Sequence, residues 1–535
     1  MSKQEITVVL SFFSFPVLLF TAHAQNDLVW TGAIPLLIGT VTFGFVCYGV
    51  GLLFLREPAK AAVLAAITAI LTLQYTDIFD PLRTLLPSGP VDPRTLSFIV
   101  CPLLVLVALI LIRRTSSAKA KKLTNYLAVI GSLLLALGII TTANNFLVNS
   151  KVDVSVNNED LRKEGTKTLK EKPDVYYLVF DRYTGPIGLS ESFGFDNRKF
   201  LKSLRDKGFY VADKSFSNYP VTYPSLASSL NAGELEVDGD PGEDAGYLPL
   251  QKMFRKPEVA AFLKKQDYSF VQVGSWWQNT NKSDYADRNP LTAWEVGLPF
   301  GKKVHVQYLS GTFLTGTLFG SFYQFHGGSN FSQDTKSGEI FLSQMNEVRR
   351  QARERSGPKF VFMHTLMPHP PLIFDSDGSR GFPPGLSDSE KFVRQTQFTN
   401  RQILALVDEL LTANKENPPI IILAADEGEY PPGFKKPGFY KRGTDADFRR
   451  KTNILAAFSF PCRDYDSLYS SITPVNMFRV VFNEYFGTDL ELQPDRTRIS
   501  KESRLEWLDV TDRVHRTPGP PGSAVTKTKS SIGDF

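Results

Sequence analysis

Four residues with side-chain oxygens stand where predicted strands end or a predicted helix begins. Asp181 follows the apolar run Val-Tyr-Tyr-Leu-Val-Phe, and the adjacent Asp426 and Glu427 follow the run Ile-Ile-Ile-Leu-Ala-Ala. Thr222 opens a stretch of small residues that predicts a helix, with Pro224 pre-set for its first turn. Ligands of open α/β sheets gather beyond the carboxyl ends of the strands. Carboxylates and a hydroxyl at that edge therefore predict a site for a hard divalent cation and an activated nucleophile.

Thr222 is the candidate nucleophile. A helix that begins at this residue would present free backbone N–H groups and the positive end of its dipole to an anion beside the hydroxyl. A phosphoryl or sulfuryl group would be held there, and a bound cation would lower the pKa of the hydroxyl. Threonine also commonly caps a helix without any catalytic role, so the local sequence leaves both interpretations open. Ser225 and Ser228 fall inside the predicted helix, where we expect them to face neighbouring elements.

Histidines are scarce, so their positions are informative. The sequence has six, and His369 lies between two prolines in the segment Met-Pro-His-Pro-Pro. This rigid turn suits a side chain that donates to an anionic oxygen or protonates a leaving group. His364 lies within the preceding predicted strand, where we expect a hydrogen-bonded core histidine.

The elements that must position these residues alternate between strands and helices after Pro173. The predicted strands are 174–180, 208–212, 268–274, 359–365, 418–425 and 453–459. The predicted helices are 195–206, 223–230, 257–265, 338–355, 388–413 and 474–486. This alternation predicts an α/β domain whose mainly parallel sheet is covered by helices on both faces.

The N-terminal part of the chain is dominated by apolar runs. Five stretches approach the roughly 20 residues that cross a bilayer, at 6–24, 31–55, 59–76, 95–112 and 125–147. The loops after the second and fourth stretches are the more basic ones, so the positive-inside rule places them in the cytoplasm. The chain is therefore expected to be anchored in a membrane, with its large C-terminal part on the extracytoplasmic side. No charged residue sits deep in a predicted span, which argues against a transporter.

The extreme N-terminus admits a second interpretation. Residues 1–24 combine Lys3, an apolar core and an Ala-His-Ala pattern, as a cleaved signal peptide does. Cleavage would leave four spans instead of five without changing the orientation of the rest. The long, Phe-rich run favours retention as a span.

The whole chain is expected to have four parts. These are a transmembrane anchor at 1–148, a linker at 149–172, an extracytoplasmic catalytic domain at 173–514 and a disordered, Pro- and Gly-rich tail at 515–535. The formal net charge of +5 gives no case for nucleic-acid binding. Only Cys462 of the three cysteines lies outside the apolar runs, so no disulfide framework or cysteine-based zinc site is expected in the soluble part.

At these residues the chain resembles the alkaline phosphatase and sulfatase superfamily. The resemblance covers roughly residues 173–490 and extends in layout to the membrane-anchored lipoteichoic acid synthases and lipid A phosphoethanolamine transferases. Those proteins carry five N-terminal spans before an extracytoplasmic sulfatase-like domain. The resemblance implies that Thr222 is the nucleophile and that His369 contacts the transferred group. It also implies a metal site, whose ligands would be Asp181, Thr222, Asp426 and Glu427.

Three departures from the family pattern bear on the chemistry. Glu427 stands where the family has a histidine, which makes the expected site all-oxygen and disfavours Zn. Arg182 stands where sulfatases carry a second aspartate, which disfavours a four-carboxylate Ca site, so we expect Mn or Mg as the divalent metal. Thr222 takes the place of the cysteine or serine from which sulfatases form formylglycine, which disfavours arylsulfatase activity.

The leading hypothesis is a metal-dependent transferase. A phosphoglycerol- or phosphoethanolamine-like group would pass to an envelope lipid or glycan through a covalent threonine intermediate. One alternative is a phosphodiesterase or sulfuric ester hydrolase that uses water as acceptor. Another is a catalytically inactive, membrane-anchored binding protein, which the Asp-Glu pair in place of Asp-His supports.

Overall fold

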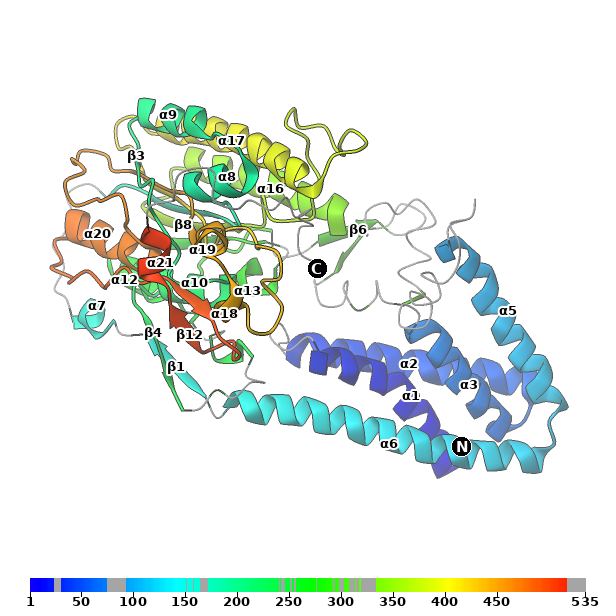
Figure 1. Ribbon diagram of the computed structural model, residues 1–535. Helices are drawn as coiled ribbons and strands as arrows, with labels where there is room; N and C mark the ends of the chain where they lie inside the picture. Colours follow the sequence, from blue (N-terminus) through cyan, green and yellow to red (C-terminus); the bar gives the residue numbers. More distant parts are fainter. Residues whose placement is uncertain are drawn as a thin grey trace. The chain divides into compact units, whose positions relative to one another are not determined.

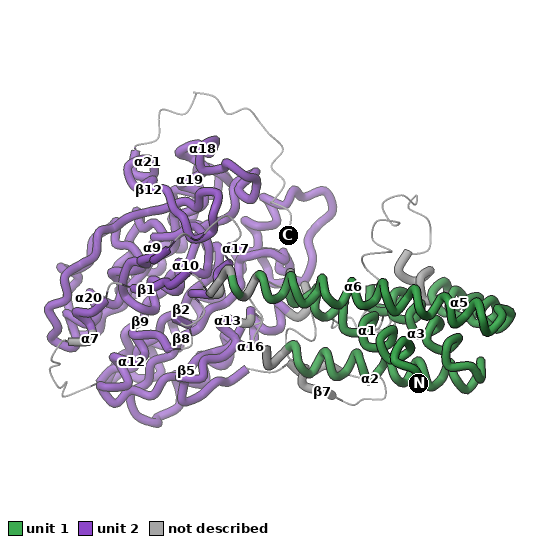
Figure 2. Tube along the Cα trace, turned by 90° about the horizontal axis from the view of Figure 1, so that it is seen from below, with its two compact units in different colours: residues 1–148, 293–333 green, residues 149–292, 334–535 purple. Residues whose placement is uncertain are grey.

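The computed structural model describes most of the chain as two compact units (Figures 1 and 2). The described residues are 1–23, 30–74, 93–150, 152–156, 158–163, 172–239, 241, 246–250, 253–254, 256–275, 277–291, 294–297, 303–306, 313, 317–318 and 333–516. Unit 1 comprises residues 1–148 and 293–333, and unit 2 comprises 149–292 and 334–535. Of the tail predicted at 515–535, residues 517–535 lie outside the described residues, and His515 is the last residue of a short helix.

Unit 1 is built from apolar helices. They are α1 (Lys3–His23), α2 (Trp30–Leu55), α3 (Pro58–Leu73), α5 (Pro93–Arg114) and α6 (Ser117–Ser150). Among the described residues, three segments are long and apolar enough to cross a membrane, namely Lys3–Ala22, Ala33–Leu55 and Ser117–Asn144. Helix α3, with 16 residues, is shorter. The structure therefore supports three spans, and the expected count of five is not confirmed.

Burial distinguishes these helices from those of a soluble core. Val9, Phe13 and Ala62 of α1 and α3 are buried against one another, whereas α6 leaves large apolar side chains such as Leu133 and Ile140 exposed. A helix that exposes Leu and Ile at successive turns lacks the polar outer face of a soluble protein. Its outer surface instead suits a lipid environment.

Part of the later sequence belongs to unit 1. Within residues 293–333, strands β6 (Trp294–Gly297) and β7 (Lys303–Val306) form an antiparallel pair. Phe313 packs edge-on against Phe20 of α1, with ring centroids 5.5 Å apart, and joins a small cluster with Val17 and Leu36.

Unit 2 is organised around a six-stranded sheet with the order β3-β10-β9-β2-β8-β5. Its strands are β2 (Val175–Phe180), β3 (Tyr210–Val211), β5 (Ser269–Val273), β8 (Lys359–Thr365), β9 (Ile420–Ala424) and β10 (Ala456–Ser459). The pairs of β2 with β8 and β9, and of β5 with β8, are parallel, while β10 runs antiparallel to both of its neighbours. The sheet is therefore mixed, with β10 reversed in an otherwise parallel arrangement. Each of the six predicted strands contains one of its members.

Helices cover both faces of this sheet. Val175, Tyr177 and Val179 of β2 face one buried core, and the alternate residues Tyr176 and Leu178 face the other, as the period of a strand requires. The first core is closed by α10 (Thr222–Ser229), α12 (Glu258–Lys265) and α20 (Pro474–Phe486). The second is closed by α8 (Pro186–Phe193), α9 (Arg198–Asp206), α16 (Gln333–Arg353) and α17 (Asp388–Ala413). Because both faces of β2 are covered, its run of six residues is apolar or aromatic throughout.

Smaller elements complete unit 2. Strand β1 (Asp153–Val156) pairs with β4 (Leu235–Asp238), and helix α7 (Glu159–Lys163) follows β1. Strand β1 and helix α7 lie within the range expected to be a linker. Helix α13 (Gln278–Asn281) follows β5, and α18 (Phe439–Arg442) and α19 (Asp445–Thr452) follow β9. Strands β11 (Arg498–Ser500) and β12 (Trp507–Asp509) form a hairpin near the end, followed by α21 (Thr511–His515).

Candidate metal centre and nucleophile

Three neighbouring parallel strands end beside one another and present chemical groups at that edge. Strand β2 lies between β8 and β9, and Val179 aligns with His364 on one side and with Ala424 on the other. Asp181 follows β2, and its backbone N–H donates to the carbonyl of Thr365 over 2.9 Å. Asp426 follows β9 by two residues. Parallel pairing thus brings Asp181, His364 and Asp426 together from three distant parts of the sequence.

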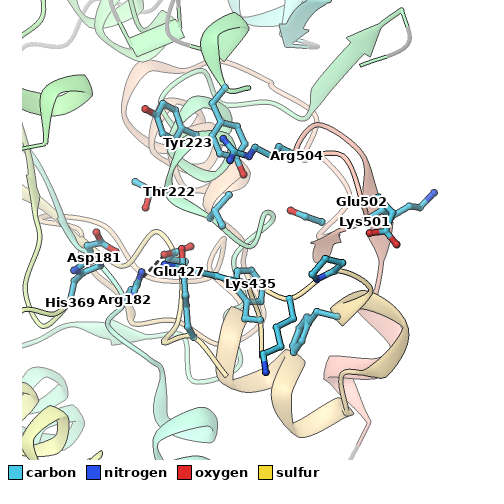
Figure 3. A pocket seen from close by; sticks show the side chains of 18 of the residues that line it. Asp181, Arg182, Thr222, Tyr223, His369, Glu427, Lys435, Lys501, Glu502 and Arg504 are labelled. Carbon is cyan, nitrogen blue, oxygen red and sulfur yellow. Dashed lines mark hydrogen bonds and ion pairs between the residues drawn. The ribbon is translucent and has the colours of Figure 1, made fainter. Parts of the chain in front are cut away.

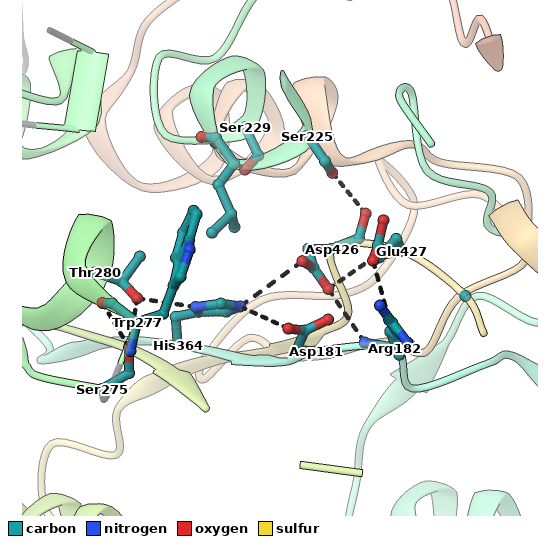
Figure 4. Close-up of polar contacts among 12 residues, drawn as sticks. Asp181, Arg182, Ser225, Ser229, Ser275, Trp277, Thr280, His364, Asp426 and Glu427 are labelled. Atoms are coloured by element: carbon teal, nitrogen blue, oxygen red, sulfur yellow. Dashed lines mark hydrogen bonds and ion pairs between the residues drawn. The ribbon is translucent and has the colours of Figure 1, made fainter. Parts of the chain in front are cut away.

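These three side chains form a buried carboxylate–histidine cluster (Figure 4). One ligand atom from each lies within 4.8 Å of the others. His364 Nε2 is 3.9 Å from Asp181 Oδ2 and 3.7 Å from Asp426 Oδ2. Hydrogen bonds between N and O are shorter, about 2.7–3.2 Å, whereas two ligands on one tetrahedral ion with bonds of 2.0–2.2 Å lie about 3.3–3.6 Å apart. The separations are therefore close to those of atoms that share a metal ion.

The unpartnered atoms of the cluster support this interpretation. Asp181 Oδ1, His364 Nε2 and Asp426 Oδ2 are buried without a hydrogen-bond partner among the described residues. The other imidazole nitrogen, Nδ1, is held by the hydroxyl of Thr280 at 3.0 Å, so Nε2 points at the carboxylates. Metal-bound histidines are commonly oriented through their second nitrogen in this way. The residues present therefore fit a divalent cation held by two carboxylates and one imidazole.

The pKa values reflect a concentration of negative charge. Burial and the charges of Asp426 and Glu427 raise the pKa of Asp181 well above its ordinary value. Burial also acts to raise the pKa of Asp426, but the neighbouring His364 and hydrogen bonding from Thr222 outweigh it and lower that pKa. Two carboxylates in a dry site repel each other when both are ionised. A bound cation would remove this repulsion.

Glu427 points toward a different set of groups. Its carboxylate lies 2.9 Å from Lys451 Nζ and 3.4 Å from Arg182 Nε, and all three side chains are buried. Arg182 Nη1 also lies 3.7 Å from the buried carboxylate of Glu429. We call Arg182, Glu427, Glu429 and Lys451 the ion-pair cluster. Burial raises the pKa of Glu427 and lowers that of Lys451, because the loss of solvent disfavours each charged form by more than the attraction between the two charges compensates.

Gly428 allows this cluster to form. A Cβ at this position would lie 2.2 Å from the carbonyl oxygen of Arg450, so only glycine permits the close approach of the two segments. The Gly428 N–H donates to the Lys451 carbonyl over 2.7 Å, and Lys451 Nζ donates back to the Gly428 carbonyl over 2.7 Å. The glycine of the Asp-Glu-Gly turn thereby fixes the end of α19, and with it Lys451, against Glu427.

Arg182 has an unusual backbone conformation for a residue with a side chain. Its φ is +56°, in the left-handed region that non-glycine residues rarely adopt. Its guanidinium lies 3.6 Å from the centroid of the Tyr430 ring, a cation–π contact, and Lys451 Nζ lies 4.0 Å from the same ring. Strained conformations of this kind concentrate at functional sites. Here the conformation accompanies the turn from Asp181 of one cluster to Arg182 of the other.

Thr222 is the first residue of α10, and Val221 occupies the cap position. No side-chain cap hydrogen bond is present at this helix start, so the capping role considered for Thr222 has no support here. Ser225, one turn later, donates from its hydroxyl to the Asp426 carbonyl over 2.6 Å. This bond fixes the start of α10 against the segment that carries Asp426, as Figure 4 shows.

His369 lies in the turn after β8 and lines the same cavity as Thr222. Its backbone N–H donates to the Asp181 carbonyl over 3.2 Å, and its Nδ1 contacts the Pro370 carbonyl. A carbonyl only accepts, so Nδ1 carries the proton of that contact. Burial and the positive charge of Arg182 lower the pKa of His369 well below its ordinary value. The low pKa therefore keeps this imidazole neutral at neutral pH.

A cavity of about 580 Å³ opens over these groups. Figure 3 shows Asp181, Thr222, His369 and Glu427 on one of its sides. The aromatic residues Tyr223, Tyr247, Trp277, Tyr430 and Phe434 contribute to its walls. A cavity of this size holds a small organic ligand, so there is room for more than the group that reacts at Thr222.

The sequence matches a known protein family. The family model described as Sulfatase matches residues 188–478, more than half of the chain. The chain belongs to the Sulfatase family. The expected resemblance to the alkaline phosphatase and sulfatase superfamily is thereby confirmed, and the protein is an enzyme of the sulfatase superfamily. No curated protein matches it in sequence.

Solved structures similar to this Sulfatase-family enzyme include transferases and hydrolases. The C-terminal periplasmic domain of EcEptC from Escherichia coli has 14% identity and a TM-score of 0.39, covering 64% of this chain and 95% of that one. The integral membrane lipooligosaccharide phosphoethanolamine transferase A (EptA) from Neisseria meningitidis has 12% identity and a TM-score of 0.39, covering 90% of this chain and 95% of that one. The phosphonate monoester hydrolase of Agrobacterium radiobacter has 12% identity and a TM-score of 0.34, covering 61% and 80%.

The Sulfatase-family site contains two residues that sequence reasoning did not assign to it. His364 was expected in the core, and Lys451 was expected on a solvated basic face, with contact to an anionic headgroup as the alternative. For His364 a signal existed, because it lies one residue before the end of a predicted strand that could neighbour β2. For Lys451 none existed, since its contact with Glu427 depends on how α19 returns to the sheet. The imidazole absent after Asp426 is thus provided by β8.

Proposed function

We propose that this enzyme transfers a phosphoryl-linked group from a membrane phospholipid to a hydroxyl of an envelope lipid or glycan. The observation that carries the proposal is the convergence of three unpartnered buried atoms, from Asp181, His364 and Asp426, beside the hydroxyl of Thr222. Thr222 cannot form the formylglycine of sulfatases, which favours phosphoryl over sulfuryl chemistry.

Asp181, His364 and Asp426 are the residues to which we assign the metal. The imidazole adds a nitrogen ligand to the two carboxylates, a donor set that suits Mn or Zn better than Mg or Ca. This set differs from the all-oxygen site expected from the sequence, because Glu427 is neutralised by Lys451 and Arg182. A divalent cation bound there would lower the pKa of the Thr222 hydroxyl and stabilise negative charge on the reacting oxygens.

The reaction has two halves. In the first, Thr222 Oγ1 forms a bond to the donor phosphorus while the bond from phosphorus to the donor alcohol breaks. The Thr222 proton ends on the released alcohol, and His369, which lines the same cavity, contacts the transferred group. In the second half, the acceptor hydroxyl attacks the phosphothreonine, the Thr222 Oγ1–P bond breaks, and the acceptor proton ends on Thr222. The first turn of α10, with its N–H groups and positive dipole, faces the anionic phosphoryl group throughout.

The membrane arrangement belongs to the same proposal. The three apolar segments, together with α3 and α5, would make five spans, and the catalytic unit would lie on the extracytoplasmic side of a bacterial inner membrane. A lipid donor and an envelope acceptor are both available at that surface.

The test uses the full chain in detergent micelles with Mn and phosphatidylethanolamine or phosphatidylglycerol. We expect the peptide that contains Thr222 to gain the mass of the phosphate-bearing headgroup. Thr222→Val should abolish the adduct and lower turnover by at least about 10³-fold, because the nucleophile is removed while the side-chain shape is kept. Thr412→Val, which removes an exposed hydroxyl of α17, is the matched control. An active, folded Thr222→Val protein would refute the mechanism, and headgroup release without an acceptor would identify a hydrolase instead.

A further inference from the structure

The cavity over Thr222 has a second wall that the proposed chemistry does not use. It is formed by the segment between β9 and α18 and by the turn of the β11–β12 hairpin. The charged residues of this outer wall are Lys435, Lys436, Lys501, Glu502 and Arg504. Figure 3 shows Lys501, Glu502 and Arg504 on the side of the cavity opposite Asp181 and His369.

The outer wall has an excess of positive charge. Lys501 is neutralised by Glu506, at 2.7 Å from the Lys501 Nζ, and Glu502 is the one acid among the lining residues of this wall. Lys436 and Arg504 are exposed, so their charges are available to a ligand from solvent or a membrane surface. Cations along a cavity wall raise the local concentration of anions. The outer wall therefore favours an anionic ligand group.

Aromatic rings line the path between Thr222 and these cations. Tyr223, adjacent to Thr222, stacks on Tyr247 with ring centroids 4.7 Å apart and an angle of 18°. The guanidinium of Arg504 lies 5.7 Å from the centroid of the Tyr247 ring. Trp277 packs edge-on against Tyr223 at 4.8 Å. A continuous apolar strip therefore connects the reactive hydroxyl with the outer cations, and it suits the body of a sugar or a lipid headgroup.

We propose that the outer wall binds a second anionic group, a phosphate, sulfate or carboxylate, carried by the same substrate that reacts at Thr222. Lys436 and Arg504 are the specificity residues, and the preferred substrate is an anionic sugar or lipid headgroup with two separated negative groups. This inference rests on the proposed function, since that function places the first anionic group beside Thr222. It adds the substrate class, which the site chemistry alone does not specify.

The experiment measures equilibrium binding to the full chain in neutral detergent with Mn, in a Thr222→Val background where no turnover occurs. The first arm compares glucose 1,6-bisphosphate with glucose 6-phosphate. The second compares micelles containing phosphatidylglycerol phosphate with micelles containing phosphatidylglycerol. In each arm the ratio of the two affinities reports the second phosphate, because the first phosphate is common to both ligands.

We expect the doubly charged ligand to bind about three- to thirtyfold more tightly, as two partly solvated charge contacts allow. Lys436→Gln combined with Arg504→Gln should reduce this ratio to about one and remove its dependence on salt. Lys415→Gln combined with Arg401→Gln is the matched control. It removes the same charge from exposed residues outside the cavity, and Arg401 stacks near Phe398 as Arg504 does near Tyr247. The control should keep the ratio.

A response in the first arm would identify a glycan as the source of the anion, and a response in the second a membrane lipid. Both outcomes support the inference. A ratio near one in the protein with Lys436 and Arg504 intact, or an equal ratio in all three proteins, would overturn it. Failure of the Thr222 adduct together with a retained ratio would refute the transfer chemistry and leave the outer anion site standing.

Discussion

Two buried clusters of charged residues lie next to each other at the carboxyl edge of the sheet, and their charges are balanced in different ways. The ion-pair cluster contains its own cations, Lys451 and Arg182, beside Glu427. The carboxylate–histidine cluster has two acids and a histidine, and among the described residues no Lys or Arg forms an ion pair with either carboxylate. Buried charge is stable only when it is paired. The first cluster has its counter-charges within the protein, whereas the second has the donor set that fits a divalent cation from solution.

The two clusters also explain why the adjacent acids Asp426 and Glu427 have different partners. Asp426 and Glu427 are neighbours in sequence, yet one points toward His364 and the other toward Lys451. Gly428 allows the segment that carries Lys451 to approach closely, so that Glu427 faces Lys451 while Asp426 faces His364. A turn that looks like one acidic motif thus provides one group to each cluster.

The largest expected effect comes from removing the internal cation of the ion-pair cluster. Lys451→Met would leave the buried Glu427 with Arg182 as its remaining ion-pair partner. Breaking a buried pair in this way costs about 3–5 kcal/mol of unfolding free energy. Thermal and denaturant unfolding of the full chain in detergent measure it. Lys415→Met, on the surface, should change stability by less than about 0.5 kcal/mol. A Lys451→Met protein as stable as the unchanged chain would show that the pair contributes little.

The second-largest expected effect is the difference in metal affinity between substitutions in the two clusters. His364→Gln should weaken Mn or Zn binding by roughly 100-fold, because a direct ligand is replaced and direct ligands matter at least as much as their supports. Glu427→Gln should lower stability while leaving metal affinity within about threefold, since its partners are Lys451 and Arg182. Isothermal titration calorimetry on the full chain measures both. The reverse pattern, with loss in Glu427→Gln and none in His364→Gln, would restore the all-oxygen site expected from the sequence.

The smallest effect concerns a third charged pair, away from the site. Arg479 of α20 is fully buried and pairs with Asp160 of α7, whose side chain is 37% exposed. Burial acts to raise the pKa of Asp160, but the hydrogen bonds and charge of Arg479 outweigh it, so the folded-state pKa lies below its ordinary value. The stabilisation is therefore present above about pH 4 and is lost as the pH falls through the lower folded-state pKa.

Asp160→Asn tests this pair. It should cost at most about 1 kcal/mol at pH 7, because exposure screens the interaction. Arg479 also retains its hydrogen bonds to the carbonyls of Ala232 and Glu491. The unfolding curves of the two proteins should approach each other as the pH falls below about 4, through the folded-state pKa of Asp160. A constant difference across this range would mean that packing, not charge, explains the loss.

Much of the fold could be predicted because local patterns determine it. The buried strands β2 and β9 are continuous apolar or aromatic runs, and α20 begins at Pro474 and ends just before Gly487, whose φ is +64°, as its sequence punctuation predicts. The reversal of β10 could not be predicted, since strand direction depends on the connection rather than on the strand's own residues.

The site was predictable only where a residue's role follows from its own strand end. Asp181 and Asp426 met that condition, and the structure brings both into one cluster. His364 did not, because its contribution requires knowing that β8 pairs with β2 in parallel register. Glu427 is the opposite case. Its position after a strand implies a metal ligand, but in the structure its carboxylate contacts Lys451 of α19. No local sequence pattern connects these two residues.

The division of the chain into units has a practical consequence for anyone who wishes to separate them. Because residues 293–333 group with the N-terminal helices, the polypeptide passes between the units three times, after residues 148, 292 and 333. Truncation of the chain near residue 149 would give a fragment that still contains residues 293–333, which belong to unit 1. In that fragment the apolar Phe313 would lack its packing partners Val17 and Leu36. A soluble form of the catalytic unit would instead need two changes to the sequence. The N-terminal helices would be removed, and residues 293–333 would be replaced by a short polar linker. The connectivity, rather than the apolar N-terminus alone, sets how the catalytic unit can be isolated.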